Sequence, residues 1–243
     1  MSTVTPPREK VFKPTTAPPT FTTPLIEGHR LDQPTFHVRY EATPPGIRAE
    51  LIGGVVSMPS PLGYEHGGST IALAVWLDHY AEHTPGVQAL DNATVILDWR
   101  NEPQPDLTLR VLPDYGGRTR NERVYVAGVP ELIVEVSRSS RYVDLGPKRD
   151  EYERAGVQEY VVRSVDPDEI LWHLLEDGRY VVLSPDQEGV FRSQVFPGLW
   201  LDPKALLAGD RAANRAALDR GLQTPEHAAF VAKLAAIRGT PVP

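Results

Sequence analysis

The chain has 243 residues, 41% of them hydrophobic, and a formal net charge of −7 at pH 7. It contains no cysteine, which excludes disulfides, thiol catalysis and thiolate zinc sites. An excess of 32 Asp and Glu over 25 Lys and Arg counts against a protein that coats nucleic acid unspecifically. The sequence has no apolar run of about 18 residues and no secretory signal at its start, so we expect no membrane span and a cytoplasmic location.

Residues 1–36 are predicted to form an extended arm. Threonines are frequent there, few large apolar residues are available to bury, and prolines interrupt any helix at Pro6, Pro7, Pro14, Pro18, Pro19, Pro24 and Pro34. The composition favours a loosely packed tail. The alternative is an arm that wraps around a neighbouring subunit.

A compact domain is predicted over residues 37–204, and its first elements have clear signals. Residues 50–58 indicate two short strands joined by a Gly-Gly turn. A helix is expected over 68–82, ended by Pro85-Gly86, because one apolar stripe follows helical spacing through Leu73, Trp76, Leu77, Tyr80 and Ala81.

Two strands are expected next, over 93–98 and 106–111. Residues 112–129 contain Gly116-Gly117 and several arginines, and are predicted to be a long irregular loop. Loops of this length inside a compact domain are often functional.

A strand–helix–strand unit follows. Residues 130–136 form a β-branched apolar run with a charge inside it, which is typical of a strand buried on both faces. A helix is expected over 147–155, with Pro147 in its first turn and Gly156 just past its end. The strand expected over 157–165 should then be parallel to the first.

The rest of the chain is predicted to close the domain and extend it. A hairpin is expected over 169–184 because Asp177-Gly178 separates two alternating apolar runs. Residues 196–201 should pack against the core, and residues 205–243 form an alanine-rich helical extension. Its apolar residues suggest a lid at Leu206, Leu207, Ala213 and Leu218, and a further stripe at Phe230, Leu234 and Ile237.

Glu135 is the unusual residue of the buried strand. An ionised carboxylate there costs several kcal/mol unless it is paired or bound to a cation. Asp106 begins a second strand, and neighbouring strands would bring both carboxylates to one end of the sheet. Two carboxylates, a backbone carbonyl and water suit Mg²⁺, so we expect Asp106, Glu135 and the carbonyl of Val136 as ligands. Taken alone, however, Asp106 also fits an ordinary turn residue.

Lys148 and Tyr152 share one face of the expected helix beyond the end of the Glu135 strand. A lysine aimed at that sheet end would orient a water or stabilise charge on phosphate. The alternative is an ordinary solvated helix face formed by Lys148 and Arg149, with i, i+4 partners such as Glu153. Asp144 is expected to cap the helix, and Glu50 is a candidate third acid.

His66 precedes the first long helix, where it would contact a phosphate or a site carboxylate, cap the helix, or pack against Tyr64. The histidines show no HExxH-like spacing, so a zinc hydrolase is not indicated, and there is no glycine-rich phosphate-binding loop.

Several short segments occur along the chain in a characteristic order: Ala49-Glu50-Leu51-Ile52-Gly53-Gly54, Met58-Pro59-Ser60-Pro61, His66, Gln104-Pro105-Asp106, Pro130-Glu131-Leu132-Ile133-Val134-Glu135-Val136, residues 144–152, residues 155–160 and Val165-Asp166-Pro167. Through these segments the chain, from Phe36 to Pro203, resembles the Uma2-type restriction endonucleases, a branch of the PD-(D/E)xK nuclease superfamily. One departure is Ser137-Arg138-Ser139, where the family usually reads Ser-Pro-Ser.

The resemblance implies a restriction-endonuclease-like core of class α/β (α+β), in which helices flank a mixed central sheet. It places the metal-binding acids at Asp106 and Glu135 and an early helper acid at Glu50. The lysine of the plain superfamily motif is replaced by Ser137, and Lys148 on the following helix would take its place. Tyr152 is a supporting candidate.

The implied activity is that of a Mg²⁺-dependent DNA endonuclease, with Mn²⁺ as a substitute ion and a homodimer as the simplest way to cut two strands. The alternative is a non-catalytic binding or scaffold protein on the same fold, which the acidic balance and the terminal segments would suit. Hydrolysis of another phosphate ester is a third option. Sequence specificity would come from residues 112–129 or from the termini.

Overall fold

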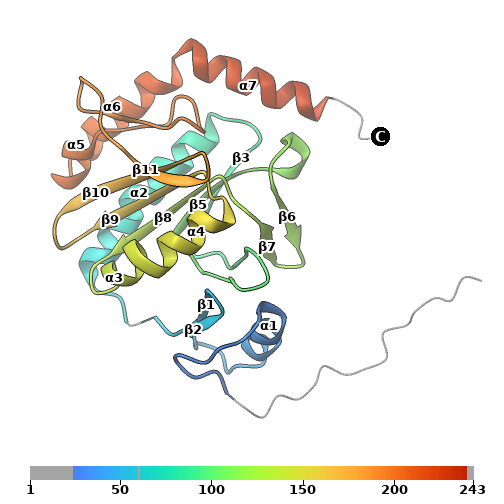
Figure 1. The fold of residues 1–243 in the computed structure, drawn as a ribbon. Coiled ribbons are helices and arrows are strands. Elements are labelled where there is room, and N and C mark those ends of the chain that lie inside the picture. The colour runs from blue at the N-terminus through green and yellow to red at the C-terminus, as the bar shows by residue number, and fades with distance from the viewer. Residues whose placement is uncertain (1–23, 60, 240–243) are drawn as a thin grey trace, which may run out of the picture.

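The computed structural model describes residues 24–59 and 61–239, and its central element is a six-stranded mixed sheet (Figure 1). Across the sheet the strands follow the order β11 (Arg179–Leu183), β10 (Glu169–Glu176), β9 (Glu159–Ser164), β8 (Leu132–Ser137), β5 (Leu107–Val111) and β3 (Val87–Asp91). β8 and β9 are parallel, and the other neighbouring pairs are antiparallel. The expected α/β class with a mixed central sheet is confirmed.

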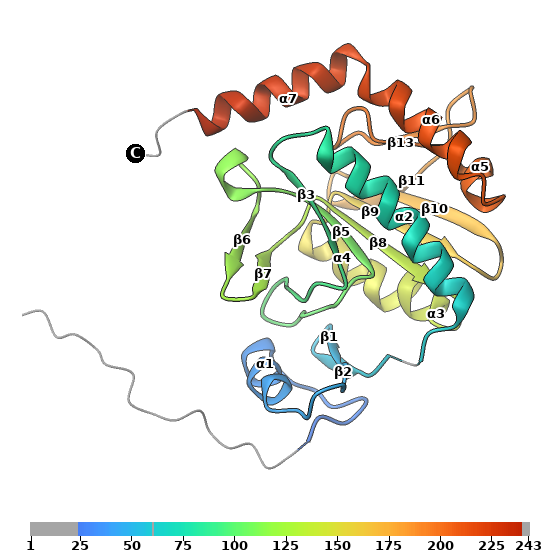
Figure 2. The ribbon, with the colours of Figure 1, turned by 180° about the vertical axis from the view of Figure 1, so that it is seen from behind.

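Helices cover both faces of this sheet. α2 (Tyr64–Glu82) lies on one face, and α4 (Arg149–Ala155) lies on the other (Figures 1 and 2). α4 continues from α3 (Arg141–Val143) and from the π-helical turn η2 (Asp144–Lys148). The sheet is therefore shielded from solvent on two sides, as the apolar run in β8 requires.

The alternation of side chains along β8 decides which residues meet each helix. Leu132, Val134 and Val136 pack in the main core with α2, while Ile133 packs with Tyr152 of α4. Glu135 therefore emerges on the α4 side. The predicted burial of this strand on both faces is confirmed, since every residue of β8 is buried.

The crossover between the two parallel strands begins earlier than predicted. The helical segment starts at Arg141, not at Pro147, and non-helical backbone at Gly146 kinks it. Gly156 ends α4 in the left-handed conformation at φ 87°, which glycine adopts without a steric penalty. The helix and its expected end are confirmed, while the expected start is wrong.

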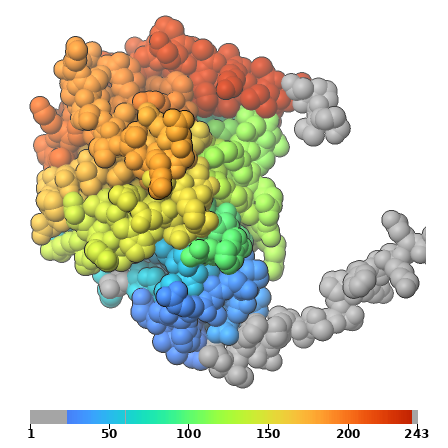
Figure 3. Space-filling model, in the orientation of Figure 1, coloured from blue at the N-terminus to red at the C-terminus, as the bar shows by residue number. Residues whose placement is uncertain are grey.

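The N-terminal part of the described chain forms α1 (Gln33–Glu41), β1 (Glu50–Ile52) and β2 (Val55–Ser57). The space-filling view shows it as the blue end of the molecule, opposite the C-terminal helices (Figure 3). The predicted turn is confirmed, because Gly53 and Gly54 join the two strands with φ of 60° and 80°. His37 and Gln33 attach α1 to the domain through hydrogen bonds of 2.8 and 2.6 Å to the carboxylate of Glu102.

The predicted extended arm over residues 1–36 is wrong at its end. α1 begins at Gln33, and Pro34 lies in its first turn, where the missing N–H has no helical partner to lose. The Asp32 carboxylate caps the helix by accepting a hydrogen bond of 2.9 Å from the Thr35 N–H. The arm over residues 1–23 lies outside the described residues.

The region before β8 contains the largest errors of the sequence analysis. α2 begins at Tyr64 and not at residue 68, β3 was not predicted, and the strand expected over 93–98 is reduced to β4 (Val95–Ile96). The loop expected over 112–129 is ordered structure: η1 (Pro113–Tyr115), β6 (Thr119–Glu122) and β7 (Tyr125–Gly128). β7 pairs with β6 on one side and with β4 on the other.

After β9 the predicted hairpin is confirmed as β10 and β11, with Asp177 and Gly178 at φ of 48° and 78° in its turn. β12 (Phe191–Arg192) and β13 (Trp200–Leu201) follow, and residues 196–201 pack on the core as expected. Trp76 and Tyr80 of α2 hold this segment by donating hydrogen bonds to the carbonyls of Trp200 and Pro197, at 2.8 and 2.9 Å.

The C-terminal helices are α5 (Pro203–Leu207), α6 (Arg211–Leu222) and α7 (Pro225–Arg238). The expected helical character of this extension is confirmed for its described residues. Leu218 and Leu234 join the main core, whereas Ile237, expected in the same stripe, is 39% exposed. Within the described part of the chain, no helix combines the length and apolar character needed to cross a membrane.

Candidate active site

The pairing of β5 with β8 brings Asp106 and Glu135 together. Leu107 lies opposite Val134 in the antiparallel register, so the position before β5 faces the position after Val134. The Asp106 N–H lies 3.4 Å from Glu135 Oε2, and the Val136 N–H donates a hydrogen bond of 2.7 Å to Asp106 Oδ2. The two acids thus meet at one end of the sheet, as the sequence analysis expected.

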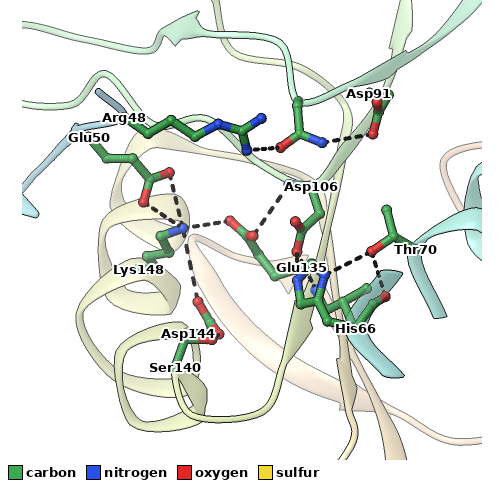
Figure 4. A network of polar contacts seen from close by, with 12 residues as sticks. Arg48, Glu50, His66, Thr70, Asp91, Asp106, Glu135, Ser140, Asp144 and Lys148 are labelled. Atoms are coloured by element: carbon green, nitrogen blue, oxygen red, sulfur yellow. Dashed lines mark hydrogen bonds and ion pairs between the residues drawn. The ribbon is translucent and has the colours of Figure 1, made fainter. Parts of the chain in front are cut away.

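Lys148 lies inside the same cluster (Figure 4). Its ammonium is 3.0 Å from Glu135 Oε1, 3.0 Å from Glu50 Oε2 and 4.0 Å from Asp144 Oδ1. Lys148 is only 6% exposed, so the alternative that it lies on a solvated helix face is wrong. Lys148 lies one helical turn before Tyr152, which packs with Ile133 of β8, so both side chains face the sheet.

Tyr152 extends the network from one turn further along the crossover helix. Its hydroxyl donates a hydrogen bond of 3.0 Å to Glu135 Oε1, the oxygen that also accepts a hydrogen bond from the Lys148 ammonium. Burial and the nearby charge of Glu135 raise the pKa of Tyr152 well above its usual value, so the hydroxyl stays protonated as a donor. The orientation of the Glu135 carboxylate is therefore held from two sides.

Asp144 takes a different place from the predicted one. It was expected to cap the helix, but it lies within the helical segment, 3% exposed, and accepts a hydrogen bond of 2.6 Å from the Ser140 hydroxyl. Burial raises its pKa to about 6, against the opposing effect of Lys148. Asp144 is a fourth acid of the cluster that sequence reasoning assigned to another role.

His66 contacts Asp106 from α2, the helix on the other face of the sheet from α4. Its Nε2 lies 3.2 Å from Asp106 Oδ2, and Thr70 Oγ1 lies 3.3 Å from its Nδ1. The hydrogen bond to Asp106 raises the pKa of His66, with burial opposing and the Val136 backbone adding to the rise. Of the alternatives stated for this residue, contact with a site carboxylate is the one found. Gly63, not His66, is the N-cap of α2.

The charges of the cluster do not balance. Glu50, Asp106, Glu135 and Asp144 are all buried, and the cations among them are Lys148 and, when protonated, His66. Burial raises the pKa of Glu135 well above its usual value, and the positive charge of Lys148 opposes this rise. The negative charges of the other three acids, Asp106, Asp144 and Glu50, add to the rise. Burial lowers the pKa of Lys148, but the surrounding carboxylates outweigh it and raise that pKa well above normal. A second cation would relieve the remaining repulsion.

The donors present fit Mg²⁺ as that cation. Asp106, Glu135 and the Val136 carbonyl supply only oxygen, which this ion prefers, and it usually keeps several waters. Among the described residues, no third acid or histidine joins Asp106 and Glu135 in a group whose ligand atoms all lie within 4.8 Å of one another. Water would therefore complete the coordination.

The cluster forms the floor of an open cleft of about 1060 Å³. Arg48 and Arg138 line it beside the acids and place positive charge at its walls. Sequence reasoning missed both arginines. Arg138 could have been found, because it stands where the family usually has the proline of Ser-Pro-Ser. None of the lining residues comes from 112–129, the segment expected to read the substrate.

A mixed sheet between helices, with acids and a lysine at its rim, defines a nuclease-like α/β protein. The crystal structure of a putative nuclease belonging to DUF820 from Anabaena variabilis has a similar fold, with a TM-score of 0.53 over 70% of this chain and 96% of that one. At 14% identity the likeness shows the fold alone.

The family is established by the sequence. Residues 34–204 match the Uma2 family, described as "Putative restriction endonuclease", and the chain belongs to this family. The resemblance stated from the motifs is thereby confirmed. No curated protein matches the chain.

Proposed function

We propose that the protein is a Mg²⁺-dependent endonuclease that hydrolyses phosphodiester bonds of DNA, with Mn²⁺ able to replace Mg²⁺. The observation that carries the proposal is the buried Lys148, held between Glu135 and Glu50 within the cleft that Asp106 lines. Burying a lysine among several carboxylates costs several kcal/mol in desolvation. Membership of the nuclease family supports the same conclusion.

In this proposal Asp106 and Glu135 would hold the ion with their carboxylates, assisted by the Val136 carbonyl. When bound, Mg²⁺ would neutralise charge on the scissile phosphate and lower the pKa of a coordinated water. Lys148 would position the attacking water and offset the negative charge that develops on the phosphate. Glu50 keeps the Lys148 ammonium at the floor of the cleft, and Tyr152 fixes the orientation of Glu135.

The direct test is cleavage by the full-length protein. We expect plasmid and linear duplex DNA to be cut with millimolar Mg²⁺ or Mn²⁺ and left intact with chelator, and calorimetry to show Mg²⁺ binding. Ca²⁺, which is larger and coordinates loosely, is the control ion. If neither Mg²⁺ nor Mn²⁺ binds and no nucleic acid is cut, the scaffold alternative replaces the enzyme. Single-stranded DNA, RNA and a simple phosphodiester in the same assay decide the substrate.

We propose a homodimer as the working form, because one copy of the site can attack one strand at a time. Light scattering of the full-length protein, alone and with duplex DNA, measures this directly. A monomer that cuts both strands at one position would contradict the proposal.

Tyr152 provides a graded test of the network. The substitution Tyr152→Phe removes one hydrogen bond to Glu135, and we expect the cleavage rate to fall about tenfold, because such a bond contributes about 1.5 kcal/mol. Tyr160→Phe is the matched control, since that buried hydroxyl donates to the Asp144 carbonyl at 3.0 Å and does not touch Glu135. Equal rates in the two variants, at similar thermal stability, would show that Tyr152 has a structural role alone.

A further inference from the structure

A second group of metal-binding residues lies at the far end of α2. One ring nitrogen each of His79 and His83 and one carboxylate oxygen of Glu82 all lie within 4.8 Å of one another. His66, at the cleft, is 13 residues away along the helix, or about 20 Å. We propose that His79, Glu82 and His83 bind a divalent transition-metal ion such as Zn²⁺, independently of the cleft.

The partners of His79 orient its ring as in known metal sites. Its Nε2 is 2.7 Å from Asp219 Oδ1 on α6, which leaves Nδ1, 3.7 Å from Glu82 Oε2, as the ligand atom. Metal-bound histidines usually donate their other ring N–H to a carboxylate in this way, which fixes the tautomer and increases the basicity of the ligand nitrogen.

His83 and Glu82 are free to adjust to an ion. Nδ1 of His83 lies 2.9 Å from the His79 carbonyl, which occupies one ring nitrogen and leaves the other available. His83 is exposed, and the Glu82 side chain is 65% exposed, so both can rotate without disturbing the core. The last turn of α2 also carries the negative end of the helix dipole, which favours a cation.

Arg215 is the competitor for this site. Its Nη1 lies 2.7 Å from His79 Nδ1, so the guanidinium donates to the nitrogen that would bind the ion. This contact shows that Nδ1 presents a lone pair to the cluster. Because Arg215 is exposed on α6, its side chain can move aside when the ion arrives.

The ligand set selects the class of ion. Two imidazoles and one carboxylate, with water in the open position, suit Zn²⁺ and neighbouring ions such as Co²⁺. Mg²⁺ prefers oxygen and would not compete here. These residues do not follow the HExxH spacing of common zinc hydrolases. His79 and His83 lie four residues apart, but Glu82 directly precedes the second histidine instead of following the first.

The test is calorimetric titration of the full-length protein with Zn²⁺, with and without excess Mg²⁺. We expect one Zn²⁺ to bind at His79, Glu82 and His83 in both cases and to raise the melting temperature, since it stabilises the native state. His83→Ala should weaken binding at least tenfold, and Asp219→Asn about tenfold. Arg215→Ala should strengthen it, because the competing cation is gone.

Two controls separate this site from other zinc ligands. His29→Ala removes a histidine elsewhere, and Glu135→Gln alters the cleft; both should leave this Zn²⁺ binding unchanged. Co²⁺ should give an absorption band that His83→Ala abolishes. Absence of Zn²⁺ binding, or binding that persists unchanged in His83→Ala, would overturn the proposal whatever the outcome of the DNA cleavage assays.

Discussion

Replacing Glu135 by glutamine is expected to lower metal-dependent DNA cleavage by a factor on the order of 10²–10³ or more while leaving the fold intact. Glutamine keeps the shape of the side chain and an oxygen for Tyr152, but it removes the negative charge that would hold the ion. The loss should appear in both the cleavage rate and the affinity for Mg²⁺. Cleavage under single-turnover conditions and Mg²⁺ calorimetry measure the two effects.

Glu159→Gln is the matched control for this prediction. Glu159 is also a buried carboxyl, on the neighbouring strand β9, where it accepts hydrogen bonds from the Ser193 hydroxyl and the Gln194 N–H at 2.6 and 2.8 Å. Burial raises its pKa to about 7, against these hydrogen bonds. We expect this variant to cleave at the wild-type rate at a temperature where it stays folded. Retained cleavage in Glu135→Gln, or equal losses in both variants, would refute the role of Glu135.

Replacing Lys148 by methionine is expected to abolish cleavage and to destabilise the protein by about 3–5 kcal/mol near neutral pH. The substitution leaves Glu135 and Glu50 buried without the ammonium that lies 3.0 Å from each. Breaking such a pair by removing one partner costs more than the pair contributes when intact. Urea unfolding measures the loss, and Lys233→Met on the exposed surface of α7 controls for the change of residue type.

The pH dependence of this loss has a definite sign. The folded-state pKa of Glu135 is already raised above the unfolded value of 4.5, so folded protein binds the proton more tightly and stability falls as pH rises above that value. Lys148 opposes this rise, and its removal lifts the pKa further. The variant should therefore approach wild-type stability near pH 5 and diverge from it toward about pH 8. An equal difference at both pH values would contradict this account.

Elements with strong local signals were predicted well. The Gly53-Gly54 and Asp177-Gly178 turns require positive φ, and the two hairpins formed around them. Glu135 could be singled out because a lone charge in a β-branched apolar run has few explanations other than pairing or cation binding. Pairing of neighbouring strands then brought Asp106 beside it.

The failures share a cause, which is that long-range contacts decided the structure. Strand β6 has only polar residues, and the buried Arg110 holds it by donating a hydrogen bond of 2.7 Å to Asn121 Oδ1, a contact that no local pattern shows. α1 begins within a proline-rich stretch because Phe36 is buried against residues of β1 and β2. The long-range contacts of such segments outweigh their weak local preference.

By itself, the sequence determined the class of fold, the strand that carries Glu135 and the small set of acids and lysine from which a site could be built, because these depend on periodicity and on the cost of burying a charge. Only the tertiary structure decided that Lys148 faces inward, that Asp144 joins the cluster and that His66 contacts Asp106. Those outcomes depend on how α2 and α4 pack on opposite faces of the sheet. The packing of these helices on the sheet sets the direction of each side chain, and that packing is decided by contacts between residues far apart in the chain.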